Sequence, residues 1–213
     1  MAKSNKTSST VTRVIIILSS VIAILSLYIL FTNDLADKPL AGQGSHITGD
    51  ALIGGDFVLT DQDNNKFSSE AMKGRLSLVY FGFTFCPDIC PTSLQKLGAV
   101  ITTLDKYNID VLPIFITVDP QRDTSGLLKE YLGHFHGKII GLTGDEESIK
   151  EVADLYKVFY AVAENHDKAQ DKYMLDHSSF IYLMNKDGKY VKHFSMDSSA
   201  EDIINYIRIK NSQ

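Results

Sequence analysis

Cysteine is scarce in this sequence, because only two of the 213 residues are cysteines. Two cysteines cannot build the disulfide scaffold that stabilises many small secreted domains, so the fold must rest on a hydrophobic core. Both lie in one short segment, Phe85-Cys86-Pro87-Asp88-Ile89-Cys90-Pro91. A disulfide between them would close a very short loop and stabilise the fold little. We therefore interpret the pair as a chemical site, against the alternatives of a structural disulfide or two buried thiols.

Basic residues are fewer than acidic ones. The chain contains 21 Lys and Arg residues and 26 Asp and Glu residues, which gives a net charge of −5. Outside the segment 1–13, the chain carries 18 basic and 26 acidic residues. This balance argues against nucleic acid as a partner and against further attachment to a membrane surface. Internal repeats and low-complexity tracts are absent too, and the length suits one domain with a proper core.

Acidic residues are missing from the segment 1–13, and charge is missing altogether from the segment 14–31. Eighteen residues make roughly 27 Å of helix, close to the hydrocarbon thickness of a bilayer. We predict an uncleaved transmembrane anchor at 14–31, with 1–13 as a basic arm on the cytoplasmic or matrix side. A cleaved signal peptide is the alternative. Against it, the apolar run exceeds the usual roughly 7–15 residues, and no clear Ala-x-Ala site follows.

The segment 32–49 is polar and rich in Gly, Asp and Lys, which predicts a tether. Residues 50–213 then form the folded domain. The predicted location is an inner membrane (cytoplasmic or mitochondrial), with the domain in the periplasm, the extracytoplasmic space or the intermembrane space. Neighbouring thiols tend to pair in such oxidising compartments.

From residue 54 onward, short apolar runs predict strands, and apolar residues at helical spacing predict helices. The predicted strands are 57–60, 66–67, 76–82, 111–118, 179–184 and 190–194. The predicted helices are 92–107, 124–131, 145–158 and 200–209. The turn 185–188, Asn-Lys-Asp-Gly, is typical of a hairpin. A strand, a helix and a strand, followed by a hairpin and a helix, predict an α/β fold of the thioredoxin type, with the cysteines after its first central strand.

The spacing of the cysteines leaves two kinds of chemistry open. Cys86-x-x-x-Cys90 is one residue longer than the Cys-x-x-Cys of redox motifs. Thiolates at a helix N-terminus are favoured by the helix dipole, so at least one cysteine should have a lowered pKa. Such thiolates attack disulfides or bind a soft metal ion. The spacing alone favours neither.

A third ligand favours metal. His177 directly precedes the predicted strand 179–184, and in a thioredoxin fold the loop before that strand approaches the cysteine loop. Two thiolates and an imidazole suit Cu(I), and a fourth ligand allows Cu(II). Zinc would prefer a fourth protein ligand in a closed structural site. The alternative is that His177 only caps a loop.

The remaining candidates are interpreted as solvated or packing residues: His46, His134, His136, His166, His193, Met174, Met184 and Met196. His134 and His136, on one side of an extended segment, form a second conceivable metal pair, and the methionines are conceivable soft ligands. Asp123 or Thr124 suits a helix N-cap, whereas Asp119 near the cysteines would tune charge or meet a partner. A Cys-His hydrolase is disfavoured because it needs no second cysteine.

The segment 81–92, Phe-Gly-Phe-Thr-Phe-Cys-Pro-Asp-Ile-Cys-Pro-Thr, resembles the signature of the SCO/SenC proteins. These are membrane-anchored, thioredoxin-like copper proteins of cytochrome c oxidase assembly. The segments 119–124 and 176–178 resemble that family's second and third motifs, and the resemblance covers roughly residues 50–210. Carried over by position, it implies copper ligands at Cys86, Cys90 and His177.

The resemblance implies a metallochaperone that binds Cu(I) or Cu(II) and delivers it by ligand exchange, rather than an enzyme in the strict sense. Its implied partners are cytochrome c oxidase subunit II, with its dinuclear copper site, and other copper carriers. The family also implies a rival function, in which Cys86 and Cys90 act as a thiol–disulfide oxidoreductase or a redox sensor. The sequence leaves these functions open.

Overall fold

The computed structural model describes residues 16, 18–26, 28, 53–164, 166–168 and 173–211. The chain divides into two units, Met1–Asp50 and Ala51–Gln213. In the first unit, residues 18–26 are helical and exposed. The predicted arm and tether lie outside the described residues, as does part of the predicted anchor. None of the described helices combines the length and apolar character that crossing a bilayer requires.

The second unit is built on a seven-stranded mixed sheet in the order β2-β1-β5-β4-β3-β8-β9. Its strands are β1 (Val58–Asp61), β2 (Lys66–Ser68), β3 (Leu76–Gly82), β4 (Val111–Thr117), β5 (Ile140–Thr143), β8 (Ile181–Met184) and β9 (Tyr190–Phe194). β3 runs parallel to β4 and antiparallel to β8. β6 (Tyr160–Val162) and β7 (Leu175–His177) form a separate antiparallel pair. The predicted thioredoxin-like α/β fold is confirmed.

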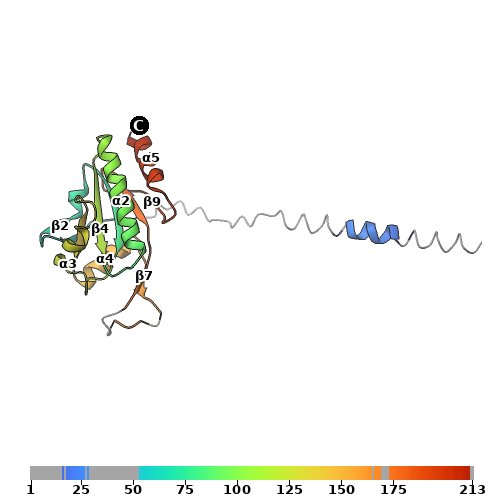
Figure 1. Ribbon diagram of the computed structural model, residues 1–213, viewed down its shortest axis with the longest axis horizontal. Coiled ribbons are helices and arrows are strands. Elements are labelled where there is room, and N and C mark those ends of the chain that lie inside the picture. Colours follow the sequence, from blue (N-terminus) through green and yellow to red (C-terminus); the bar gives the residue numbers. More distant parts are fainter. Residues whose placement is uncertain are drawn as a thin grey trace, which may run out of the picture. The chain divides into compact units, whose positions relative to one another are not determined.

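Helices cover both faces of this sheet. They are η1 (Ser69–Met72), α2 (Ile89–Lys106), α3 (Ser125–Leu132), α4 (Glu146–Leu155) and α5 (Ala200–Asn211). Successive side chains of a strand point to opposite faces, so Tyr80 meets Cys90 of α2 while Phe81 packs on Tyr156 at the end of α4. α2 and α5 lie side by side (Figure 1). The central strands β3 and β4 are mainly apolar and almost wholly buried because both of their faces are covered.

Several element boundaries differ from the sequence prediction. α2 begins at Ile89 rather than at residue 92, because Pro91 fits in a first turn, where its missing N–H costs no bond. α4 ends at Leu155 rather than at residue 158, since Lys157 adopts a left-handed φ of 56°. The strands β5, β6 and β7 were not predicted from the sequence. Gly141 interrupts the run of apolar residues that would have indicated β5. The structure requires glycine there, because a Cβ would lie 2.4 Å from the Leu132 side chain.

Candidate metal centre

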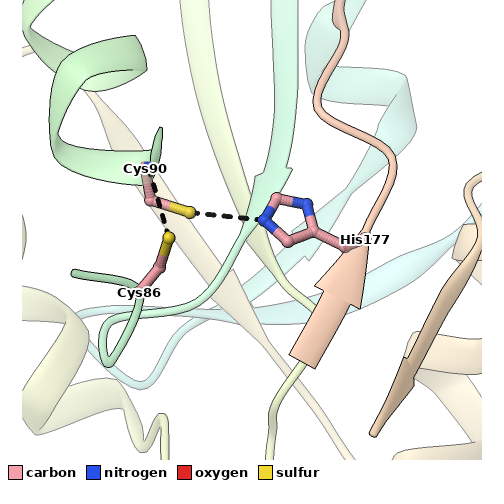
Figure 2. A group of neighbouring side chains, drawn as sticks. All are labelled: Cys86, Cys90 and His177. Atoms are coloured by element: carbon pink, nitrogen blue, oxygen red, sulfur yellow. Dashed lines mark hydrogen bonds between the residues drawn. The ribbon is translucent and has the colours of Figure 1, made fainter. Parts of the chain in front are cut away.

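Three elements bring the predicted ligands together at the carboxyl end of β3. Cys86 lies in the loop after β3, Cys90 lies in the first turn of α2, and His177 ends β7. One ligand atom from each residue lies within 4.8 Å of the others. Figure 2 shows the two sulfur atoms and the imidazole pointing toward one another. The prediction that His177 directly precedes a strand was wrong in detail, because it ends β7 and β8 begins only at Ile181.

Hydrogen bonds fix the orientation of the three side chains (Figure 2). The Cys90 backbone N–H donates to the Cys86 sulfur over 3.4 Å, and His177 Nε2 lies 3.5 Å from Cys90 Sγ. On the other side of the ring, His177 Nδ1 lies 3.2 Å from the Ser178 carbonyl oxygen. A proton on Nδ1 donates to that carbonyl, which leaves the Nε2 lone pair directed at the sulfurs. Metal-binding imidazoles are commonly held in this way.

The two thiols differ in acidity because they share one proton. Hydrogen bonds from the Cys90 side chain and the Cys90 backbone N–H hold the pKa of the Cys86 thiol well below its usual value. The side-chain hydrogen bond raises the pKa of the Cys90 thiol, as does its burial. Cys86 is therefore the thiolate, and it is also the half-buried, accessible member of the pair.

Aromatic side chains and one glycine enclose the inner side of the site. The buried Tyr80 hydroxyl donates to Cys90 Sγ over 3.5 Å, and burial raises the pKa of Tyr80, so it remains a donor. The Phe83 ring packs edge-on against His177, with 5.7 Å between ring centroids. A Cβ at Gly82 would lie 2.7 Å from Cys90 Sγ, so only glycine fits there.

The motif at 119–124 contributes no ligand to the cluster. It holds the segments that carry the ligands in place. The buried Asp119 carboxylate accepts from Arg122 Nε and from the Tyr173 hydroxyl, each over 2.5 Å. The Arg122 guanidinium lies 3.6 Å from the Tyr173 ring centroid and 4.5 Å from that of Phe85. Asp119, Arg122 and Tyr173 thus clamp the cysteine loop to the chain that leads into His177. No local sequence pattern pointed to a role for Tyr173.

Asp123 anchors the start of the cysteine loop. Its carboxylate accepts from the Thr84 backbone N–H and hydroxyl, over 3.0 and 2.5 Å, and from the Thr117 hydroxyl over 2.6 Å. Burial raises the pKa of Asp123, against the effect of these hydrogen bonds. Of the two predicted N-caps, Thr124 is the one that caps α3, by accepting from the Leu127 N–H.

The outer side of the site is open. A cleft of about 340 Å³ lies beside it, lined by Cys86, Pro87, Asp88, Ile89, Met174, Leu175, Asp176, His177 and Ser179. Its position lets an incoming ligand reach Cys86 and His177 without disturbing the core. Met174 therefore borders the site, whereas Met184 is wholly buried and Met196 accepts from the Ser93 hydroxyl.

The other histidines lie outside this cluster. Within the described parts of the chain, Cys86, Cys90 and His177 form the one group of three or more His, Cys, Asp or Glu residues close enough to share a metal ion. His136 Nδ1 accepts from the Lys138 N–H, and His193 bonds with the Tyr190 hydroxyl. His46 lies outside the described residues.

The comparison with known families agrees with this geometry. The family model described as SCO1/SenC matches residues 45–210. The chain belongs to the SCO1/SenC family. It is 52% identical to the "SCO2-like protein" of Rickettsia felis over 203 residues, which covers 95% of this chain and 98% of the relative.

Solved structures of relatives share the fold. The crystal structure of Arabidopsis thaliana ScoI with copper bound is 40% identical, with a TM-score of 0.71, and covers 76% of this chain and 99% of that one. BsSco, a member of the Sco family of cytochrome c oxidase assembly proteins in which a disulfide switch was identified, is 28% identical, with a TM-score of 0.60. It covers 76% of this chain and 94% of that one. The copper and the disulfide switch are properties of those proteins.

Proposed function

We propose that this chain binds one copper ion through Cys86, Cys90 and His177 and serves in cytochrome c oxidase assembly. The observation that carries the proposal is the convergence of two sulfurs and an imidazole nitrogen within 4.8 Å, beside an open cleft. Soft thiolates and an imidazole fit Cu(I), and a fourth ligand from the cleft side allows Cu(II). The copper bound in the crystal structure of the 40% identical Arabidopsis relative supports the choice of metal.

The site's own residues prepare the binding and release of copper, which is the cargo. The Cys86 thiolate is available to the incoming ion, and Cys90 gives up its proton when the ion binds. The Ser178 carbonyl keeps His177 in the tautomer that offers Nε2. Because the cleft exposes Cys86 and His177, thiolates of a partner such as the copper site of oxidase subunit II, or of another copper carrier, can replace these ligands one at a time.

We further propose that the segment 14–31 anchors the chain in an inner membrane and that residues 50–213 face the exported side. The uncharged run and the basic arm before it support this topology. Protease added to sealed, right-side-out membranes should digest the domain. Digestion from the cytoplasmic or matrix side alone would reverse the topology.

Metal analysis of ligand variants tests the copper site. The reduced protein should bind one copper, Cys86→Ser or Cys90→Ser should abolish tight binding, and His177→Ala should weaken it or change the Cu(II) spectrum. His193→Ala is the matched control, since His193 bonds to the Tyr190 hydroxyl and packs on the Phe180 and Tyr182 rings, outside the ligand cluster. If Cys86→Ser keeps full affinity and a sulfur-to-Cu(II) absorption band, the ligands lie elsewhere.

A thiol–disulfide function is the second candidate, favoured by one observation. A low-pKa, half-buried Cys86 next to a protonated, buried Cys90 is the arrangement of an attacking thiolate and a resolving thiol. Turnover of a disulfide substrate by the metal-free reduced protein would support it. A protein that forms the Cys86–Cys90 disulfide, releases copper on doing so and turns over no substrate supports the copper function.

A further inference from the structure

The end of the domain opposite the metal centre gathers basic residues. β3 begins at that end with Leu76 and finishes at Gly82 beside the cysteines, so the two ends are separated by roughly 20 Å, the length of a seven-residue strand. We name this end the basic pole. It comprises Lys73 and Arg75 before β3, Lys106 at the end of α2, Lys186 and Lys189 in the β8–β9 turn, and Arg208 and Lys210 at the end of α5.

These residues form one surface, because their elements are joined directly. The Gly74 N–H donates to the Lys186 carbonyl over 2.8 Å, which joins the turn before β3 to the β8–β9 turn. The Arg208 guanidinium lies 3.9 Å from the centroid of the Tyr107 ring, which joins the end of α5 to the end of α2.

The charge of the basic pole is opposite to that of the domain. Residues 51–213 carry 17 basic and 23 acidic residues, a net charge of −6. At the pole, seven basic residues accompany four acidic ones, namely Glu70, Asp105, Asp110 and Asp187. Of these acids, Asp105 pairs with Lys138 over 2.6 Å, whereas Glu70 and Asp110 pair with Lys73 and Arg75 of the pole itself, over 2.5 and 3.8 Å. The overall negative charge, which by itself argues against a membrane surface, therefore conceals a charge asymmetry along the direction of β3.

Helix stability accounts for only part of this asymmetry. Basic residues in a last helical turn complement the helix dipole, which explains Lys106 and the two basic residues of α5. Lys73, Arg75, Lys186 and Lys189 lie in turns, where no such effect operates. Because Lys73 and Arg75 are ion-paired with neighbouring acids, Lys186 and Lys189 in the β8–β9 turn are the informative ones.

The basic pole also contains apolar surface. A groove of about 430 Å³ opens there between the β8–β9 turn and the end of α5. Its apolar lining residues are Leu76, Leu183, Val191 and Ile207, and its polar ones are Asn185, Lys186, Asp187, Lys210 and Asn211. Basic side chains around apolar surface match the boundary between headgroups and acyl chains of a bilayer.

The chain enters the domain at the same end. A Cβ at Gly54 would lie 4.0 Å from the Gly188 carbonyl oxygen and 2.6 Å from the Met184 methyl group. The first described residues of the domain therefore lie at the turn that carries Lys186 and Lys189, and the sequence before them leads back to the uncharged segment 14–31.

We propose that the basic pole docks on an anionic phospholipid bilayer and holds the domain with its metal centre facing away from the membrane. The proposal rests on the membrane anchorage proposed above. Lys and Arg near an anionic surface contribute attraction residue by residue. The negative remainder of the domain is repelled by that surface, so both effects favour one orientation.

Co-sedimentation with vesicles tests the proposal on the isolated domain, residues 51–213. This part folds on its own, since its core lies between Phe57 and Ile207 and the crystallised Arabidopsis chain matches about this much of the sequence. It should bind vesicles that contain phosphatidylglycerol, but not vesicles of phosphatidylcholine alone, and high salt should release it.

Two double variants of equal net charge separate a local from a global charge effect. Lys186→Glu with Lys189→Glu should lower the partition coefficient on phosphatidylglycerol vesicles by roughly 30-fold or more. Lys129→Glu with Lys150→Glu, on α3 and α4, should change it far less. If the first variant fails to fold, as judged by its unfolding midpoint, Lys186→Gln with Lys189→Gln replaces it, with an expected loss of roughly 10- to 30-fold.

Equal effects of the two double variants would overturn the proposal, as would equal binding to both kinds of vesicle or binding to neither. Copper content, measured on the same samples, separates this result from the proposed function. A domain that binds lipid without copper overturns the copper function alone, and one that binds copper without lipid overturns the docking surface alone.

Discussion

At the scale of single residues, the Tyr80 hydroxyl is the clearest influence on the metal site from outside the ligand set. It is wholly buried and donates to Cys90 Sγ. We expect Tyr80→Phe to leave the protein folded, at a cost of about 1 kcal/mol for one buried hydrogen bond. Without that donor the sulfur is more electron-rich, so the sulfur-to-Cu(II) absorption band should move to lower energy and the reduction potential should fall.

Tyr131→Phe is the matched control for this substitution. The Tyr131 hydroxyl is buried and has no hydrogen-bond partner among the described residues, and its ring packs on Phe115, as the Tyr80 ring does. Its removal should leave the spectrum and the potential unchanged. Equal spectra for the two variants would show that the Tyr80 hydroxyl does not tune the site.

The shared proton of the cysteine pair predicts how copper affinity depends on pH. Cys86 has a lowered pKa and is already ionised at neutral pH, whereas Cys90 has a raised pKa and still carries its proton. Copper binding should release one proton, and affinity should rise about tenfold per pH unit between roughly pH 7.5 and 9. Competition titrations with a Cu(I) chelator measure this slope. A hundredfold rise per unit would mean that both thiols lose a proton.

At the scale of elements, the clamp of Asp119, Arg122 and Tyr173 couples the cysteine loop to the chain before β7. Arg122→Lys keeps the charge but loses the planar fork and the stacking on Tyr173 and Phe85. We expect it to lower the free energy of unfolding by about 2 kcal/mol and to weaken copper binding. Urea unfolding and copper titration measure the two effects. Arg208→Lys, which alters an exposed stack on Tyr107, should lower stability by less than about 0.5 kcal/mol.

The same elements show how far the sequence predicts the structure. β3, β4 and α2 were predicted because long apolar runs and helical spacing record their burial directly. The sequence also indicated the three candidate ligands, since their residue types and the family's motifs stand out locally. β6 and β7 are three-residue strands that hydrogen-bond to each other. The clamp joins Asp119 and Tyr173, which are 54 positions apart in the sequence. Neither leaves a local pattern, so neither was predictable.

At the scale of the whole molecule, the metal-free fold should not depend on the two cysteines for its stability. The core extends through both faces of a seven-stranded sheet, and the cysteines lie at one end of it. The double variant Cys86→Ser, Cys90→Ser should therefore remain folded, within about 2 kcal/mol of the reduced, metal-free protein. Copper should raise the thermal midpoint of the unsubstituted protein, because a ligand that binds only the native state stabilises it.

Calorimetry of both proteins, with and without Cu(I), measures these differences. The double variant is the control for the effect of copper. It should unfold in one cooperative transition, as the unsubstituted protein does, and copper should not raise its thermal midpoint. An unfolded double variant would show that the cysteine pair is structural, the alternative that the sequence left open. A folded variant that copper still stabilises would place the metal on other residues, with Met174 in the adjoining cleft the first to replace.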